Sequence, residues 1–559
     1  MKVKIEKNEV NEYISVNNLI LTSPYSIDDE DGRFLKKIDY SLRNTVVIIY
    51  GLGIGKYVNT LEKSLHHSNT VIIVEPYSEI ISHYEKSPYQ VMSKRIYLIN
   101  ADGDDVIKFL NDNKLNTRYK TVYSYMNYRN ILDQKYKVFI EKLRNDSIKR
   151  YSNELTLKKY DQEFTKNIFS NYFLHEFHLP VNALKNKYNR IPALIISAGP
   201  SLEKHLDCIN MFQGLVFSGG RTIKEFLQRN IRMDFMVSVD PTDKVYELVE
   251  GSDSIGIMPP LFTYLESNLK VVKNHNNTRI LMKSPSIPIS MNNEFDLDII
   301  MSGPSVSNVA VSIADYLGCN PIILIGQDLS YTDGKHHANI TIKDFDKDIE
   351  SNNLLIEVEG YYGEKIKTTA SFYSMLSSFE NWITISDKEF INSTEGGVYI
   401  NGCKHVPFKD YLSNQNLDCN DSLHDLFNVI SDDQPIYKKK IETYIYIEKI
   451  ARLSKILKKC IYYSKKINEA VSNNIGDVKH QLKQLNILDQ QIRGEMENDH
   501  MLNYLFSSAH LDFENEKRRY SKNDTLSIAK SNLQFYQSLN DNINELNNWL
   551  EENADAKSS

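Results

Sequence analysis

The strongest indication of the fold lies in the stretch Leu194-Ile195-Ile196-Ser197-Ala198-Gly199-Pro200-Ser201-Leu202. Its apolar run predicts a buried strand, the Gly-Pro-Ser turn ends that strand, and a helix is predicted to follow. A second stretch, Ile299-Ile300-Met301-Ser302-Gly303-Pro304-Ser305-Val306, repeats this order of strand, turn and helix. Each predicted helix has one apolar face, formed by Leu202, Leu206 and Ile209 in the first and by Val306, Ala310, Ile313 and Leu317 in the second.

The two Gly-Pro-Ser turns have the composition of a site for an anionic ligand. Glycine lets the backbone turn tightly and approach a ligand, proline pre-sets φ for the first helical turn, and serine can cap the helix. The free N–H groups of a helix N-terminus attract anions, and open α/β sheets bind ligands at the carboxyl ends of their strands. The sequence therefore predicts a phosphate-bearing ligand beside these turns, with good turn chemistry alone as the alternative.

Three more strand exits lie in the same region. Ser218 and Gly219 end one apolar run, and Asp240 closes the next, where a carboxylate could orient a sugar or base hydroxyl. The spacing of Asp240 and Asp243 suggests a metal, but two acidic loop residues more often form solvated caps, so no metal site is predicted. The apolar run 322–325 leads to Asp328, Tyr331, His336 and His337. Either imidazole could take a proton from an attacking hydroxyl.

Four regions follow from the periodicity, in agreement with the three or four domains that about 150 residues per domain predicts. Residues 1–120 form a Rossmann-like N-terminal domain in which residues 1–35 are a polar lead-in and strands lie at 46–50, 71–74 and 96–99. Residues 121–190 form a glycine-free helical linker, and residues 191–410 form a central, doubly wound parallel α/β domain. Residues 411–559 form a C-terminal helical bundle. The fold class is therefore α/β.

Two features of the flanking regions admit alternatives. Gly51-Leu52-Gly53-Ile54-Gly55, with Glu75 ending the next strand, fits either a nucleotide or S-adenosylmethionine site or a purely structural turn, because it departs from G-x-G-x-x-G. The C-terminal region carries apolar residues three and four apart, which fits a self-packed bundle, docking of a partner helix or association of two copies of the chain. These residues are Ile450, Leu453, Leu457, Cys460, Val478, Leu482, Leu485, Leu488 and Ile492.

Composition narrows the function. The 559 residues include 66 Lys and Arg against 73 Asp and Glu, a net charge of -7 that argues against a dedicated nucleic-acid binder. Neither an apolar run long enough to span a membrane nor a secretory signal occurs, so a cytoplasmic location is expected. The five cysteines are scattered without C-x-x-C spacing, which is typical of reduced thiols rather than of a zinc site or disulfides.

Five motifs in this order resemble the motility accessory factor (Maf) family of bacterial flagellin glycosyltransferases. They are Ser197-Ala198-Gly199-Pro200-Ser201-Leu202, Ser238-Val239-Asp240-Pro241, Ser302-Gly303-Pro304-Ser305-Val306, Gly326 to Gly334 with His337-Ala338, and Asn392-Ser393-Thr394-Glu395-Gly396-Gly397. The resemblance is sharpest over about 190–405. It implies transfer of a nonulosonic acid of the pseudaminic or legionaminic type from its CMP-activated form to Ser or Thr hydroxyls of flagellin. The central domain of such proteins is similar to bacterial sialyltransferases, which do not need a metal to bind their donor, so the resemblance implies no metal and no other cofactor.

The resemblance also implies roles for single residues. Asp240 and Asp328 would orient hydroxyls, Tyr331 would assist departure of the phosphate, and His337 would accept the proton of the acceptor, with His336 as its rival. Residues of both turns would cradle the CMP group, namely Gly199, Pro200, Ser201 and Leu202 in the first and Gly303, Pro304 and Ser305 in the second. Thr394, Glu395 and Gly396 match the family but have no role beyond a loop near the site.

Two other functions compete with this one. The Gly-Pro-Ser-Leu type of domain is similar to the shorter archaeal 6-hydroxymethylpterin diphosphokinases, which transfer pyrophosphate from ATP and need magnesium. The length of this chain and the absence of a P-loop weigh against that activity. A non-catalytic assembly factor that holds flagellin through its helices is the third reading.

Overall fold

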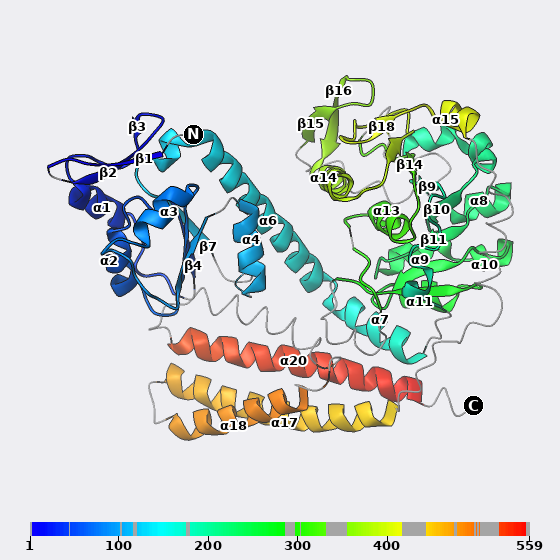
Figure 1. Cartoon of the computed structure of the whole chain (residues 1–559). Helices are drawn as coiled ribbons and strands as arrows, with labels where there is room; N and C mark the ends of the chain where they lie inside the picture. Colours follow the sequence, from blue (N-terminus) through cyan, green and yellow to red (C-terminus); the bar gives the residue numbers. More distant parts are fainter. Residues whose placement is uncertain are drawn as a thin grey trace. The chain divides into compact units, whose positions relative to one another are not determined.

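The computed structural model of the chain describes residues 3–9, 11–43, 45–100, 103–113, 115, 120–174, 179–285, 297–301, 303–330, 355–415, 443–473, 478–496, 499, 502 and 525–554. The chain forms two compact units, which Figure 1 shows coloured along the sequence. One comprises Met1–Lys159 and Asp512–Ser531, and the other comprises Tyr160–Leu511 and Asn532–Ser559. The first boundary lies inside the segment 121–190.

The first unit is built on a parallel sheet with strand order β6-β5-β4-β7. Its strands are β4 (Val46–Tyr50), β5 (Thr70–Val74), β6 (Ile96–Ile99) and β7 (Lys120–Ser124), and the helices between them are α2 (Tyr57–Ser64), α3 (Ser78–Tyr84) and α4 (Gly103–Asp112). Every residue of β4 and β5 is buried, as expected for β-branched runs in the middle of a covered sheet. The Rossmann-like fold and its three predicted strands are confirmed.

Two predictions about this unit are wrong in part. Residues 1–35 are not a polar lead-in, because β1 (Val3–Lys7), β2 (Glu12–Val16) and β3 (Leu19–Ile20) form an antiparallel sheet followed by α1 (Ile27–Leu35). The sparse apolar residues among the charges, such as Ile14 and Phe34, are fully buried and anchor it. The helical segment also starts later than 121, because Lys120–Ser124 pairs with β4 as the edge strand β7. Helices α5 (Tyr128–Ile131), α6 (Asp133–Lys159) and α7 (Asp161–Leu174) follow.

The second unit contains a nine-stranded sheet of order β18-β17-β14-β9-β10-β11-β12-β13-β8, in which every pair of neighbours is parallel. Its strands are β8 (Leu179–Pro180), β9 (Ala193–Ile196), β10 (Leu215–Gly219), β11 (Phe235–Val237), β12 (Leu261–Tyr264), β13 (Arg279–Met282), β14 (Ile322–Ile325), β17 (Phe390–Asn392) and β18 (Lys404–His405). The chain builds outward from β9 to β13 and then returns to place β14 on the other side of β9. The predicted doubly wound sheet is confirmed. The direction in which the chain adds strands to the sheet reverses between β9 and β14, although all the strands are parallel.

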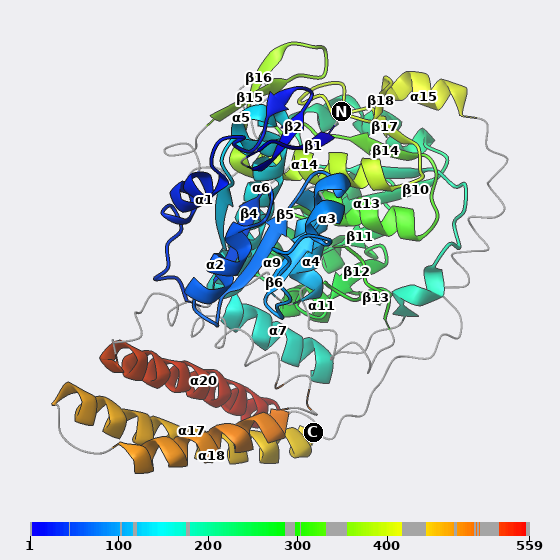
Figure 2. The ribbon, with the colours of Figure 1, turned by 60° about the vertical axis from the view of Figure 1, so that its left-hand side comes forward.

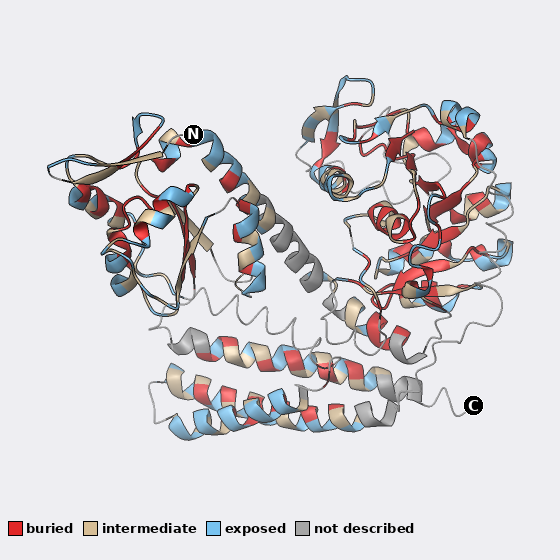
Figure 3. Cartoon of the chain, viewed as in Figure 1, coloured by how far each residue is buried: buried red, intermediate tan, exposed pale blue. Residues whose placement is uncertain are grey.

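Both faces of this sheet are covered, and successive residues of β9 show how. Ile195 packs in the cluster that contains helices α13 (Val306–Tyr316) and α14 (Ala370–Ile385), whereas Leu194 packs in the cluster on the other face. That other face is covered by α8 (Ile223–Arg229), α9 (Asp243–Val249), α11 (Leu269–Lys273) and α15 (Phe408–Asn414), with the short α10 (Ser252–Ile255) nearby. Figure 3 shows the resulting band of buried residues. Burying one leucine or isoleucine contributes about 1.5–3 kcal/mol, so this double layer holds the strand ends rigidly.

The helical C-terminal region consists, within the described residues, of α17 (Thr443–Ser472), α18 (Lys479–Met496) and α20 (Thr525–Ala554), shown in Figure 2. The predicted stripe forms the buried face of α17 and part of that of α18, where Leu485, Leu488 and Ile492 are buried. Leu482 departs from it, being 42% exposed. Tyr536 of α20 donates a hydrogen bond to Asp489 Oδ1 (3.2 Å), which ties α20 to α18.

Cys208, Cys319, Cys403 and Cys460 are buried free thiols, and Cys419 lies outside the described residues. None of the helices in the described part of the chain combines the length and apolar character that crossing a membrane requires.

Candidate functional site

The first Gly-Pro-Ser turn follows β9, at the point in the sheet where the strand order reverses. Gly199 N–H donates to Gly326 O (2.9 Å), so the turn lies directly against the residues that follow β14. A Cβ at position 199 would overlap Gly326 O and Asp328 Oδ2, which means that only glycine fits this close approach. Glycine is therefore required here by the neighbouring strand end.

The segment after this turn differs from the prediction. It consists of two 3₁₀ helices, η2 (Pro200–Lys204) and η3 (Leu206–Met211), rather than one α-helix. Ser201 does not cap a helix, because its side chain is drawn to Asp328 instead. The three apolar residues of the predicted face are nevertheless buried against the sheet.

Asp328 joins the ends of β9 and β14. Its carboxylate accepts hydrogen bonds from Ser201 Oγ (2.6 Å) and from Ser201 N–H (3.2 Å), and the residue is only 2% exposed. Charge-assisted bonds of this kind are among the stronger ones in proteins. In this structure Asp328 therefore fixes the Gly-Pro-Ser turn.

The loop after β17 completes this edge and gives Thr394, Glu395 and Gly396 a physical role. Thr394 Oγ1 accepts from Gln327 N–H (3.2 Å), and Val398 N–H donates to Asp328 O (2.9 Å). A Cβ at Gly396 would lie 3.6 Å from both Asp328 Oδ1 and Ser201 Cβ. The loop thus packs over the Ser201–Asp328 pair.

Two residues that the sequence did not single out hold the same loop. Lys204 Nζ donates to Glu395 O (2.6 Å), and His205 Nε2 lies 3.3 Å from Thr394 O, to which it donates. Burial lowers the pKa of His205 below its ordinary value, so its ring is neutral near pH 7. Their position three and four residues after Ser201, on the tight turns that follow the Gly-Pro-Ser motif, was the available signal. Lys204 is exposed and places a positive charge at the rim.

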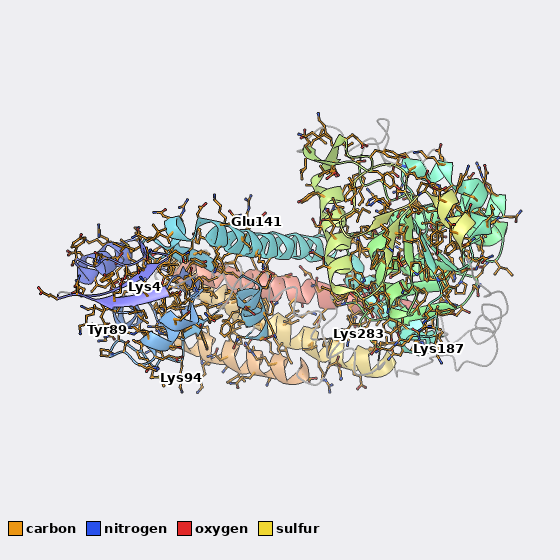
Figure 4. The ribbon with its side chains drawn as sticks, turned by 45° about the horizontal axis from the view of Figure 1, so that its top comes forward. Lys4, Tyr89, Lys94, Glu141, Lys187 and Lys283 are labelled. Carbon is orange, nitrogen blue, oxygen red and sulfur yellow. The ribbon has the colours of Figure 1, made fainter. Side chains whose placement is uncertain are left out.

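The second Gly-Pro-Ser turn starts α13. Ser305 is the N-cap of this helix, with its hydroxyl accepting from Asn308 N–H (3.2 Å), as predicted. The predicted strand before it is absent from the described residues at this point, where Ile299 makes only an isolated bridge to Lys283, which Figure 4 labels. Gly303 is half-buried, and Pro304 is exposed to solvent.

The two turns meet. Ser307, in the first turn of α13, lies 2.7 Å from Ser197 at the end of β9, oxygen to oxygen, and Ser197 also donates to Gln327 Oε1. Val306 packs against Gly219 at the end of β10, 3.1 Å from where a Cβ would lie. The N-terminus of α13 therefore stands over the carboxyl ends of β9 and β10, beside the first turn.

The remaining predicted residues divide into three cases. Ser218 is buried and donates to Ile196 O (3.2 Å), which makes it part of the scaffold. Asp240 is exposed three residues beyond β11 and accepts from Thr242 N–H (2.8 Å) and Oγ1 (2.6 Å), the solvated cap that was the alternative to a metal ligand. Tyr331, His336 and His337, with Ser302, lie outside the described residues. Within the described ranges no group of three or more His, Cys, Asp or Glu is placed to hold a metal ion.

The glycine loop of the first unit is filled by tyrosine rings. A Cβ at Gly51, Gly53 or Gly55 would overlap the rings of Tyr128, Tyr125 and Tyr84, in that order. Glu75 is fully buried and accepts from Leu52 N–H (2.9 Å) and Tyr128 OH (2.6 Å). These contacts favour the structural interpretation of this loop over a nucleotide site.

Glu75 should make the stability of the first unit depend on pH. Burial raises the pKa of Glu75 to about 7 from its ordinary 4.5, so the folded protein holds a proton that the unfolded chain releases, and stability falls as pH rises from 4.5 to 7. We expect the free energy of unfolding of the wild type, relative to Glu75→Gln, to fall by about 2–3 kcal/mol between pH 5 and pH 8. Urea denaturation at four pH values measures this, with the exposed Glu79→Gln as the matched control. Parallel profiles for wild type and Glu75→Gln would contradict it.

Comparison with protein families gives a match in the second unit. Residues 162–334 match a family described as 6-hydroxymethylpterin diphosphokinase MptE-like. The matched range includes both Gly-Pro-Ser turns and the strands β9 to β14. No curated protein has a matching sequence.

A solved structure matches almost the whole chain. It is that of a Maf glycosyltransferase from Magnetospirillum magneticum AMB-1, with a TM-score of 0.58 and 14% sequence identity, covering 99% of this chain and 92% of that one. The likeness extends over both α/β units and the C-terminal helices, and confirms at the level of the fold the resemblance that the motifs indicate.

Proposed function

We propose that the protein is a glycosyltransferase that moves a nonulosonic acid, of the pseudaminic or legionaminic type, from CMP to Ser or Thr hydroxyls of flagellin. The observation that carries the proposal is the contact between Ser197 and Ser307. It brings both Gly-Pro-Ser turns to the carboxyl ends of the strands where the strand order reverses. Open α/β sheets bind ligands at this place. The fold likeness to a Maf glycosyltransferase supports this choice of reaction.

The phosphate of CMP would bind between the first turn and the N-terminus of α13. The N–H groups of the first turn of this 11-residue helix carry partial positive charge, and an anion beside them is stabilised. Lys204 supplies a full positive charge at the rim from its position beside Glu395. Asp328 is already bonded to Ser201, so we assign it to positioning the turn rather than to touching the donor.

Transfer would break the bond between the anomeric carbon and the phosphate oxygen, with both electrons leaving on CMP. The acceptor hydroxyl attacks the opposite face of the oxocarbenium-like carbon, giving inversion, and loses its proton to a base. His337, or its neighbour His336, is the proposed base, and Tyr331 is proposed to assist the phosphate. We propose that this occurs in the cytoplasm without a metal or other cofactor, and without binding of nucleic acid or membrane.

Flagellin is the proposed partner, and the C-terminal helices are the proposed surface for selecting it or for forming homo-oligomers. The test is co-expression with flagellin in a strain verified to make the CMP-activated sugar, followed by intact-mass measurement. We expect flagellin to gain the mass of one or more nonulosonic acids, and His337→Ala and His336→Ala, made separately, to identify the base. Unmodified flagellin in the presence of verified donor would refute the proposal.

The match of residues 162–334 favours a second candidate, a diphosphokinase of the MptE-like kind that would use ATP and magnesium. A thermal-shift titration separates the two, because a ligand raises the melting temperature of the protein that binds it. The first proposal predicts a shift with CMP alone. A shift with ATP plus magnesium and none with CMP would favour the kinase, and stabilisation by neither nucleotide would favour the non-catalytic assembly factor.

A further inference from the structure

Glu266 is a buried carboxylate at the carboxyl ends of the strands, on the same side of the sheet as the candidate site. It follows β12 by two residues and is 4% exposed. β12 is separated from β10, which ends at Gly219, by β11 alone. Because neighbouring strands lie about 4.8 Å apart, the end of β12, which Glu266 follows, lies about 10 Å from the end of β10.

The side chain of Glu266 has hydrogen-bonding capacity to spare. Ser284, at the end of β13, hydrogen bonds to the carboxylate, but Oε2 has no partner among the residues that the structure describes. Burial raises the pKa of Glu266 to about 7, and the bond to Ser284 opposes this rise. An unmet buried carboxylate oxygen costs about 1–3 kcal/mol or more, which is a reason to look for an external partner.

Helix α7 lies over the same edge and leaves this oxygen free. Asn171 donates from its amide to Leu265 O (2.7 Å) and Ser267 O (2.8 Å), the carbonyls on either side of Glu266. Asn167 donates to Glu266 O (3.2 Å). The helix therefore binds the backbone of this loop, and these contacts fix where the carboxylate stands without using Oε2.

A second buried oxygen belongs to Ser238, which follows β11, the strand between β10 and β12. Ser238 follows the end of β11, is 1% exposed, and its backbone N–H donates to Phe262 O (3.1 Å). Its Oγ has no hydrogen-bond partner in the described part of the chain. Moving outward from β10, two neighbouring strand ends thus each offer one unmet, buried oxygen.

We propose that Ser238 Oγ and Glu266 Oε2 form a subsite that binds the glycosyl half of the donor, with Glu266 accepting a hydrogen bond from an N–H or O–H group on the sugar. The inference rests on the proposed function and adds specificity to it. In its ionised form, which predominates above pH 7, the Glu266 carboxylate only accepts hydrogen bonds, so there this subsite selects a sugar that presents a donor, such as the N–H of an acylamino group. A sugar that presents an acceptor would leave two buried acceptors facing each other and would be rejected.

The test compares CMP with CMP-pseudaminic and CMP-legionaminic acid in isothermal titration of the full-length protein. In Glu266→Gln the amide keeps the size of the side chain but can place a donor where Oε2 was. We expect the affinity for the better of the two CMP-sugars to fall about tenfold, while the affinity for CMP alone stays unchanged. In transfer assays KM for the donor should rise more than kcat falls, and Ser238→Ala should show the same pattern more weakly.

Glu30→Gln is the matched control, because Glu30 is also a buried glutamate (2% exposed) but belongs to the other compact unit. It should bind all ligands as the wild type does. Equal binding of CMP-sugar by wild type and Glu266→Gln would overturn the inference and assign the free oxygens to ordered water, while leaving the proposed function intact. A parallel loss of CMP and CMP-sugar affinity would also overturn it, since it would reveal a general structural role. A wild type that binds no CMP compound refutes the proposed function itself.

Discussion

Asp328→Asn is expected to lower the rate of sugar transfer at least about a hundredfold, the loss that a shift of about 1 Å in a positioned group typically causes. The carboxylate accepts from both the hydroxyl and the N–H of Ser201, and it lies where almost no solvent reaches. Asparagine has a single acceptor oxygen, so its NH₂ group would face one of these donors. The Gly-Pro-Ser turn would move away from β14, which would disturb the proposed donor site.

The measurement is kcat/KM for flagellin modification, read by intact mass, together with CMP affinity by titration. Asp240→Asn is the comparison variant, because Asp240 is an exposed aspartate at the carboxyl ends of the same strands whose carboxylate bonds only to Thr242 among the described residues. It should lose much less activity than Asp328→Asn. If Asp328→Asn kept wild-type activity and CMP affinity, the assignment of Asp328 to positioning the turn would be wrong.

Gly199→Ala should abolish detectable CMP binding and destabilise the second unit. A methyl group at this position would overlap the backbone oxygen of Gly326 and the carboxylate oxygen of Asp328, and Asp328 is buried and bonded to Ser201. The cost expected of forcing such an overlap into packed structure is about 1–3 kcal/mol. The turn can relieve it only by leaving its bond to Gly326 O, which displaces the residues that would cradle the phosphate.

Thermal unfolding and CMP titration test this variant. Gly32→Ala is the control, because a Cβ there meets nothing within 4 Å and the residue lies inside helix α1. That control should stabilise the protein by about 1 kcal/mol, as alanine favours a helix over glycine. Normal CMP affinity in Gly199→Ala would show that the first turn is not part of the nucleotide site.

Much of the fold followed from local pattern. Runs such as Val46–Tyr50 and Ile322–Ile325 combine β-branched residues with flanking glycine, and these runs are buried strands. The Ser305 cap was also predictable from local pattern, because a serine precedes a helix whose apolar face packs on the sheet. In each case the determining interactions lie within a few residues of sequence.

The failures have a common physical cause, which is that partners distant in sequence decided the outcome. Ser201 is a good helix cap, yet the carboxylate of Asp328 draws its side chain away and 3₁₀ turns replace the expected helix. For Gly51 to Gly55 the sequence left both a nucleotide site and a structural turn open, and tyrosines from elsewhere in the chain, which fill the space, favour the structural turn. The burial of Glu266 could not be predicted from the sequence, because no neighbouring residue indicates that α7 and Ser284 contact it.

The bond between Ser201 and Asp328 joins residues 127 positions apart, and this sets when the site can form during synthesis. β9 and the first turn leave the ribosome early, but they remain without their clamp until β14 has been made and inserted beside β9. Contacts of such long sequence separation form slowly, because the intervening chain must first be brought into a closed loop. A nascent chain that ends before Asp328 therefore contains the first Gly-Pro-Ser turn without the contacts that hold it in place, and the proposed donor binding would report late on completed folding in the second unit.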